Sequence, residues 1–229
     1  MVLGASTLTA ADKSALDIIK KAFQYTSSLN TYAFTANIVE DEMQEDGTSI
    51  AYKYITSVKV KRPGQLRIDT KSKFLNRSIT IDNGLFTIMR HSDNTYSQLS
   101  VSKNIDKAIE SILTKYKIKE PLASLIYSDM AKRVESHDNQ YLGTKNVDGV
   151  VCDYVRFKSQ HRDIHVWVTK GDRPQIKAYN IKDTGEHPYV TTETKISWEV
   201  NRSIQNSDFV FHSPKNSKKV AIVTENSDD

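Results

Sequence analysis

The 229-residue chain is long enough for one domain or two small ones, and its single cysteine excludes an internal disulfide and a cysteine-based metal site. The 32 Lys and Arg residues against 28 Asp and Glu give a net charge of +4 that is spread along the whole sequence. Nucleic-acid binding is therefore not expected, because it usually shows as a basic stripe on one face. No apolar run approaches the roughly 20 residues of a membrane span, so no transmembrane segment is expected.

An amphipathic helix is predicted first. Apolar residues between Ala15 and Leu29 recur at three- and four-residue spacing with lysines between them, and Asp12 can cap the segment. After Asn30 the apolar residues alternate with polar ones. Tyr32 therefore starts a strand that is buried on one side.

The rest of the first half is predicted as strands joined by short turns. Pro63-Gly64 and Asp82-Asn83-Gly84 mark turns, and the second is a tight hairpin because Asn-Gly tolerates positive φ. The basic residues Lys59, Lys61 and Arg67 alternate with apolar ones, as they do on a solvated strand face. Strands are predicted around residues 32–38, 50–60, 66–68, 79–81, 86–88 and 96–99.

The middle of the chain is helical, and the second half returns to period two. Asn104 or Ser102 can cap a helix that extends to Tyr116. Pro121 can open a short helix, which one or two further turns follow at 130–134. Strands are predicted around residues 141–147, 151–157, 164–168, 176–180, 190–200 and 209–211, with a last edge strand at 220–222.

Strands linked by short turns, with no alternation of strand and helix, predict an antiparallel sheet. About ten or eleven strands in one sheet must curl, and the amphipathic helices need an apolar surface to cover. The predicted fold class is α+β, with one large curved antiparallel sheet, a half-barrel, wrapped around about three helices. We expect a single domain over residues 12–223, with flexible termini at 1–11 and 224–229.

A set of motifs in fixed order resembles a known family. In chain order the motifs are Lys61–Arg67, Asp82–Gly84, Lys115–Leu122, Asn146–Phe157, Asp163–Val168, Gly171–Pro174 and Trp198. Each is weak alone, but the ordered set is specific. The chain resembles, over roughly residues 15 to 222, a bacterial family of predicted periplasmic proteins that is a domain of unknown function.

That family is similar in fold to the lipoprotein-localisation carriers and outer-membrane lipoprotein receptors, whose half-barrel sheet wraps helices around an acyl-chain cavity. The resemblance implies periplasmic localisation with the signal peptide removed, since Met1–Ala11 contains no basic stretch followed by an apolar core. It implies no particular ligand, because relatives use one fold for different tasks.

No combination of residues predicts an enzyme. Cys152 could act as a nucleophile with His161 or His165 as its base, but no local motif supports activation, and a free cysteine in a strand is usually a small buried side chain. The two histidines are four residues apart in a predicted strand, about 13 Å, which is too far to share one metal ion. We expect neither a metal nor a cofactor.

The aromatic residues on the predicted apolar faces suit either an ordinary core or an apolar cavity. Our first hypothesis is a periplasmic, non-enzymatic carrier-like protein that holds a lipid, a lipoprotein acyl chain or another apolar ligand between sheet and helices. The predicted lining consists of Phe34, Tyr52, Tyr54, Val58, Ile79, Phe86, Ile88, Ile109, Leu113 and Trp198.

Two alternatives stay open. The helices could fill the curl completely, and the protein would then be a structural or interaction module of the cell envelope that binds a protein partner without a ligand cavity. A hydrolase that depends on Cys152 is the third hypothesis.

Overall fold

The computed structural model describes residues 14–44, 46–116, 122–134, 138–185, 189–200 and 203–222. The termini that we expect to be flexible, and Asp12 and Pro121, lie outside these ranges. The elements in chain order are α1 (Ala15–Ser28), β1 (Thr31–Met43), β2 (Ser49–Lys61), β3 (Gln65–Lys71), β4 (Asn76–Asp82), β5 (Leu85–Arg90), β6 (Thr95–Ser100), α2 (Ile105–Lys115), η1 (Ala123–Leu125), α3 (Met130–Arg133), β7 (Asp138–Val147), β8 (Val150–Lys158), β9 (Arg162–Thr169), β10 (Ile176–Asp183), β11 (Val190–Glu199), η2 (Asn206–Phe209) and β12 (Lys218–Lys219).

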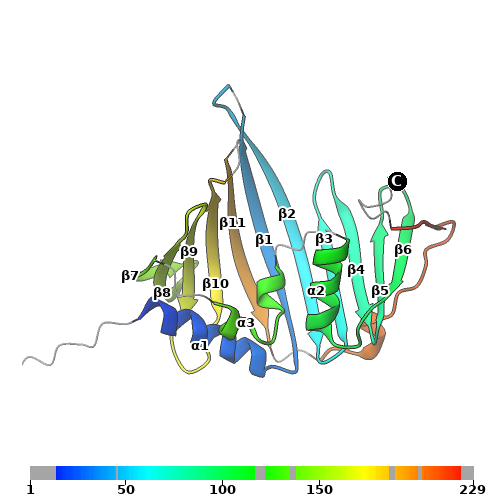
Figure 1. The fold of residues 1–229 in the computed structure, drawn as a ribbon, viewed down its shortest axis with the longest axis horizontal. Helices are drawn as coiled ribbons and strands as arrows, with labels where there is room; N and C mark the ends of the chain where they lie inside the picture. Colours follow the sequence, from blue (N-terminus) through cyan, green and yellow to red (C-terminus); the bar gives the residue numbers. More distant parts are fainter. Residues whose placement is uncertain are drawn as a thin grey trace, which may run out of the picture.

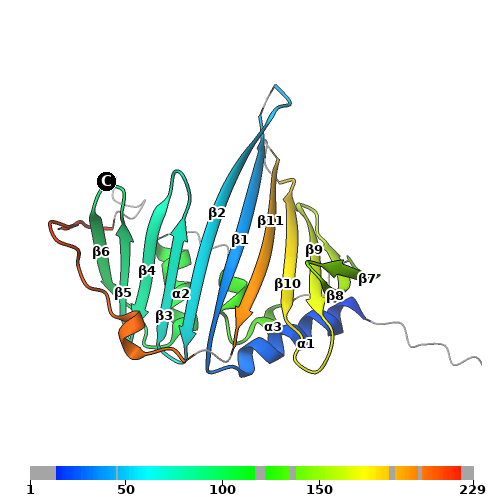
Figure 2. The same ribbon diagram turned by 180° about the vertical axis from the view of Figure 1, so that it is seen from behind.

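The strands form one open sheet in the order β12-β6-β5-β4-β3-β2-β1-β11-β10-β9-β8-β7, and α1, α2, η1 and α3 gather on one of its faces (Figures 1 and 2). We call this face the inner face and the opposite one the outer face. Every pairing is antiparallel except that of β12 with β6, which is parallel. The predicted α+β sheet around helices is confirmed. The strand expected at 209–211 does not form, because Asn206–Phe209 is the 3-10 helix η2, and the last strand is the short parallel one at Lys218–Lys219 instead of one at 220–222.

The turns follow the local chemistry of the sequence. Asn83 and Gly84 both have positive φ in the β4–β5 turn, and Asp148 and Gly149 do so between β7 and β8. Two consecutive residues with positive φ define the tight hairpin turn whose twist matches that of the strands it joins. The hairpin predicted at Asp82-Asn83-Gly84 is therefore confirmed, and Asp148-Gly149 forms a second one.

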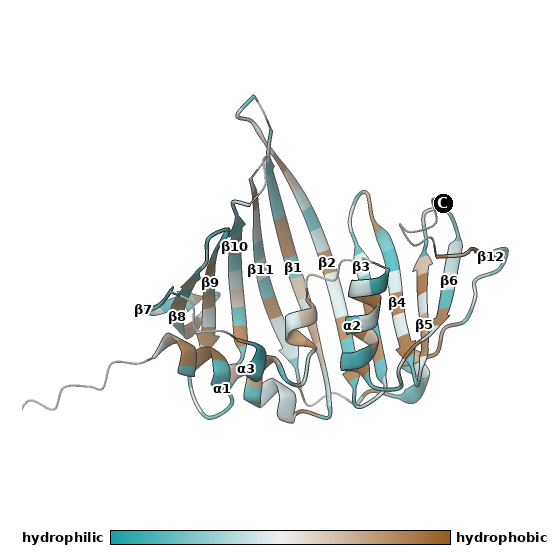
Figure 3. Cartoon of the chain, in the orientation of Figure 1, coloured by the Kyte–Doolittle hydropathy of each residue, from teal (hydrophilic) through white to brown (hydrophobic). Residues whose placement is uncertain are grey.

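Each of the two long helices begins at a residue whose side chain caps it. Ser14 caps α1, because its side chain accepts a hydrogen bond from the backbone N–H of Asp17. At α2, Asn104 is the cap and accepts from the backbone N–H of Lys107, whereas Ser102 accepts from Asn104 itself. Around α2, hydrophobic and hydrophilic residues alternate along the ribbon (Figure 3), as expected for a helix with one buried face.

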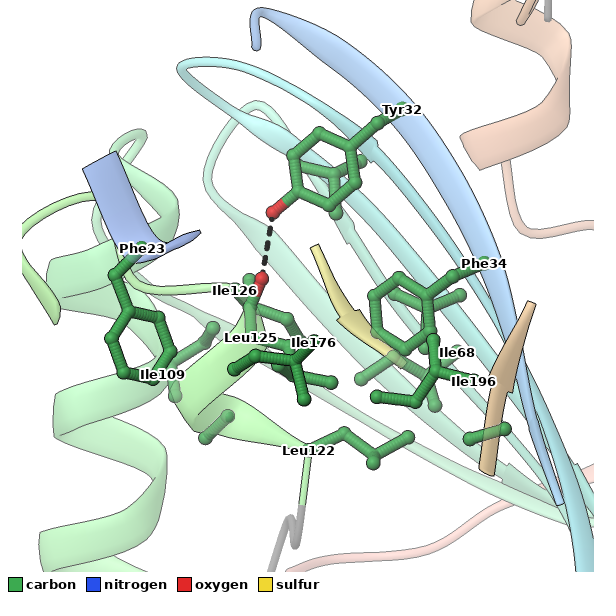
Figure 4. Packing of buried hydrophobic residues seen from close by; sticks show 14 of the residues in the cluster. Phe23, Tyr32, Phe34, Ile68, Ile109, Leu122, Leu125, Ile126, Ile176 and Ile196 are labelled. Atoms are coloured by element: carbon green, nitrogen blue, oxygen red, sulfur yellow. Dashed lines mark hydrogen bonds between the residues drawn. The ribbon is translucent and has the colours of Figure 1, made fainter. Parts of the chain in front are cut away.

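The core lies between the inner face and the helices. On the inner face, Phe34 of β1 pairs with Val58 of β2 and Trp198 of β11. The residues of the η1 segment, including Leu125 and Ile126, pack between the helices and this part of the sheet (Figure 4).

A partly buried arginine holds the η1 segment to the sheet. The guanidinium of Arg62 donates to the carbonyl oxygen of Ile126 at 2.5 Å and lies 3.4 Å from the Tyr32 hydroxyl and 3.5 Å from the Asp106 carboxylate. The Tyr32 hydroxyl in turn donates to the carbonyl oxygen of Leu125 at 3.0 Å (Figure 4). These polar contacts fix an irregular segment that has few backbone hydrogen bonds of its own.

The outer face carries a C-terminal strap, which we define as residues 203–222. Phe209 of η2 is fully buried against Ala33 and Ile204, and Asp208 forms an ion pair of 2.7 Å with Lys59. Beyond η2, the ring of Phe211 lies 5.1 Å from that of Tyr96. The lysines predicted to lie on a solvated face thus serve partly to bind this strap.

Candidate functional site

An apolar pocket of about 450 Å³ lies between the helices and the inner face of β8–β10. Its residues come from α1, the η1 segment, α3 and three neighbouring strands. All of them are apolar or aromatic except Ser124, Arg133 and Arg162. The remainder of the lining is Ile19, Phe23, Leu125, Met130, Val134, Phe157, Ile164, Val166, Ile176, Tyr179 and Ile181.

The pocket lies where two short helices adjoin the 14-residue α1, which packs against β7–β9. The η1 helix spans three residues and α3 spans four, so neither can lay a full apolar stripe across β8–β10. By contrast, the 11-residue α2 places Ile105, Ala108, Ile109 and Ile112 on one face at three- and four-residue spacing. Its side of the molecule is closely packed.

The ten residues of the predicted lining lie on the inner face and on α2, away from this pocket. Ile79, Phe86, Ile109 and Leu113 surround a void of about 20 Å³ beneath α2, which is room for about one water molecule. None of the ten lines the 450 Å³ pocket. Contact of these residues with a ligand stays a prediction.

The other predicted residues are held in the central sheet. The rings of Phe34 and Trp198 lie 4.9 Å apart, and the indole N–H of Trp198 donates to the carbonyl oxygen of Ile176 at 2.8 Å. Val58 is fully buried, and Tyr54 and Ile88 are packed at the margin of the core. The ring of Tyr52 lies 6.2 Å from that of Phe74, near the β3–β4 turn.

Two arginines stand at the exposed edge of the pocket, each held by an acidic neighbour. Arg133 donates from Nε to Asp129 at 2.6 Å, and its guanidinium lies over the ring of Tyr127 at 4.3 Å. Arg162 donates from Nε to Asp183 at 3.1 Å. The hydrogen bond to Asp129 raises the pKa of Arg133. The backbone N–H of Gly185, and then Arg162, lower the pKa of Asp183.

A second, polar depression of about 480 Å³ lies on the outer face around Asp69, Ser78 and His91. Ser78 donates its hydroxyl proton to Asp69 at 2.6 Å, and its oxygen lies 2.8 Å from Nε2 of His91. His91 can therefore only donate to this oxygen, so it does not act as a base toward Ser78. Arg67 also holds Asp69 through two hydrogen bonds. This arrangement suits a structural network rather than a nucleophile.

Cys152 is buried in β8, as predicted. Burial raises the pKa of its thiol, which disfavours the reactive thiolate. Nδ1 of His165 in β9 forms a hydrogen bond of 2.6 Å with the Tyr154 hydroxyl, and Nε2 of the same ring lies 3.3 Å from Asp163. Both ring nitrogens are thus engaged away from the thiol. Among the described residues, no three His, Cys, Asp or Glu side chains gather as a metal site would require.

The comparisons with known proteins agree with the family predicted from the residues. The family described as predicted periplasmic protein (DUF2092) matches residues 15–223. The chain belongs to this family. The DUF2092 description places the protein in the periplasm, as predicted. No curated protein matches the sequence. No helix within the described ranges is both long and apolar enough to span a membrane.

This DUF2092 protein is similar to solved structures of low sequence identity. An uncharacterised conserved protein from Thermus thermophilus is 11% identical, with a TM-score of 0.53 over 91% of this chain and 99% of that one. A LolA superfamily protein from Nitrosomonas europaea is 12% identical, with a TM-score of 0.40 over 87% and 98% of the two chains. LprF from Mycobacterium bovis is 13% identical, with a TM-score of 0.48 over 85% and 98%. At such identities the likeness to the Thermus protein shows the fold alone.

Sequence reasoning missed the pocket residues, although part of the signal was present. Ile164 has the inward parity of a strand that was predicted. Ile181 lies beyond the strand predicted at 176–180, and it faces inward because the pairing shifts register between Ile176 and Ala178. The helical segments at 122–126 and 130–134 are also visibly too short to cover several strands. How much of the sheet beside α1 the short helices leave uncovered is decided by tertiary packing, and no periodicity in this DUF2092 sequence reports it.

Proposed function

We propose that the protein is a carrier-like binding protein of the periplasm that holds a lipid, an acyl chain or another apolar ligand between its helices and β8–β10. The single observation that carries this proposal is the apolar pocket of about 450 Å³. Ligand sites in proteins usually measure roughly 300–1,000 Å³ and are mainly apolar with a few polar groups. The pocket has both properties.

Burial of hydrocarbon supplies sufficient affinity without a charged site. A buried methylene contributes about 0.8 kcal/mol, so ten methylenes contribute about 8 kcal/mol. That free energy corresponds to a dissociation constant of about 1 µM before the costs of ordering the ligand are subtracted. The void beneath α2, at about 20 Å³, cannot hold such a chain unless the helix moves.

Three tryptophan variants test where the ligand binds. Ile181→Trp fills the pocket, Ile88→Trp alters the β5 end of the inner face, where our sequence-based lining lies, and Ile55→Trp is a matched control at an exposed position of β2. We expect Ile181→Trp to weaken binding of an apolar fluorescent dye at least tenfold, with little change in the other two. Loss of binding in Ile88→Trp alone would instead favour the sequence-based lining.

The protein itself tests whether there is a ligand at all. We expect native mass spectrometry and solvent extraction of freshly purified protein to reveal a co-purified apolar compound. If no compound is found and no apolar dye binds, the carrier proposal fails. Recovery of one envelope protein in pull-down experiments would then favour the interaction module.

A further inference from the structure

Among the described residues, both charged side chains that line the pocket are arginines. They are Arg133, at the end of α3, and Arg162, at the start of β9. They lie 29 positions apart in the sequence, and both side chains retain contact with solvent, with exposed fractions of 35% and 62%. The closed end of the same pocket is formed by buried residues such as Ile19, Phe23 and Leu125. The pocket is thus amphipathic.

The acidic neighbours of the two arginines contact only part of each guanidinium. Asp129 and Asp183 each engage the Nε atom of their arginine, and Glu110 lies 3.9 Å from Nη1 of Arg133. A guanidinium has five N–H donors, so a contact at Nε leaves further donors for a second anion. Asp129, Asp183 and Glu110 do not line the pocket. They hold the arginines in place without adding negative charge to its wall.

From this arrangement we infer that the pocket selects an anionic amphiphile, whose hydrocarbon chain fills the apolar interior and whose terminal carboxylate or phosphate binds Arg133 and Arg162. The inference rests on the proposed function, because it presupposes a chain in the pocket. Arginine suits this task, since its planar fork of donors matches both carboxylate and phosphate. A cationic head group would meet two positive charges at the same edge, and a neutral one would gain only the burial of its chain.

Four ligands with the same 12-carbon chain separate the effect of the head group on binding from that of the chain. Dodecanoate and dodecyl phosphate are anionic, dodecanol is neutral and dodecyltrimethylammonium is cationic. Affinities are measured with the full chain by displacement of an apolar fluorescent dye at low ionic strength. We expect at least one anionic ligand to bind several-fold more tightly than dodecanol, and the cation to bind most weakly. The two anions distinguish a carboxylate from a phosphate, and added salt should reduce the anionic preference.

Variants test whether the two arginines cause the preference for anionic ligands. Arg133→Gln and Arg162→Gln should each weaken binding of the anionic ligand about two- to fivefold, the effect of a partly exposed ion pair, without changing binding of dodecanol. Arg156→Gln is the matched control, because Arg156 is paired with Asp163 and does not line the pocket. Asp183→Asn should have the opposite effect and tighten binding of the anion, because it releases Arg162 while its side-chain oxygen can still accept from Gly185.

The outcomes separate this inference from the proposed function. If none of the four ligands binds, the proposed function fails. If dodecanol and the anions bind equally, or if an anionic preference survives in the Arg133→Gln/Arg162→Gln double variant, the carrier function stands and the head-group inference is overturned. Thermal unfolding of each variant, compared with the wild type, confirms that the folded protein is being measured.

Discussion

Replacing Arg62 by methionine should loosen the η1 segment from the sheet. Methionine keeps most of the apolar stem but removes the guanidinium. The side chain of Arg62 is only 12% exposed. The bond of 2.5 Å to the carbonyl oxygen of Ile126 is the main loss, and a hydrogen bond from a charged donor contributes about 1.5–3 kcal/mol. The longer contacts to Tyr32 and Asp106 add less, so we expect a total loss of about 2–4 kcal/mol.

Two measurements test this prediction. For a protein of this size, each kcal/mol lowers the melting temperature by about 2–4 °C, so Arg62→Met should melt roughly 4–16 °C below the wild type. Hydrogen exchange should localise the change, because the backbone N–H groups of Leu125 and Ile126 bond only within the η1 turn. Their exchange should accelerate more than that of the β3–β4 pair.

Arg90→Met is the control, since Arg90 pairs with Asp93 at the surface and should change stability by no more than about 0.5 kcal/mol. An Arg62→Met protein as stable as this control would refute the anchoring role. So would an equal acceleration of exchange throughout the sheet, because it would show that the arginine stabilises the whole fold rather than the η1 segment.

Three further predictions concern single polar groups and one glycine. Burial raises the pKa of Tyr32 to about 12, so its contribution to stability is complete below pH 10 and is lost as the pH rises toward 12. The free energy of unfolding should therefore fall by about 1 kcal/mol more in the wild type than in Tyr32→Phe between pH 9 and 11, and equal slopes would contradict this. Burial acts to raise the pKa of Asp69, but hydrogen bonds from Arg67 and Ser78 outweigh it and lower the pKa. Asp69→Asn should therefore cost about 1 kcal/mol at pH 7 in urea unfolding, and this difference should disappear as the pH falls through the lowered pKa, below about 3.9. A Cβ atom at Gly64 would lie 2.7 Å from the carbonyl oxygen of Lys103, so Gly64→Ala should cost about 1–3 kcal/mol in urea unfolding. An unchanged free energy of unfolding would contradict the crowding argument.

The sequence predicts most of the sheet because period-two alternation is strong where only one face is buried. Residues Tyr32 to Ile38 and Thr192 to Trp198 show this pattern, and the structure pairs them across β1 and β11. The position of that pairing could not be predicted, since β1 and β11 are separated by most of the chain. Nothing local specifies which distant strand lies beside β1.

The candidate site was harder to predict than the fold. Phe34 and Trp198 are large inward aromatic residues and were natural choices for a lining, but they pack against each other. A pocket forms where side chains do not fill the space between the helices and the sheet. Whether such a space exists depends on the lengths and positions of the helices above the sheet. Likewise, Arg133 and Arg162 look like ordinary surface residues in the sequence, and only the fold brings them to the edge of one pocket.

The C-terminal strap makes the two halves of the molecule mechanically unequal. Strands β3 and β4 lie between α2 on one side and η2 on the other (Figure 2), so this half has three layers. Within the described ranges, β8–β10 are covered by helices on the inner face alone. A two-layer region bends more easily than a three-layer one, and motions that widen the molecule will therefore concentrate on the side of the pocket. The braced half can then act as a rigid frame while the other half bends outward by a small amount.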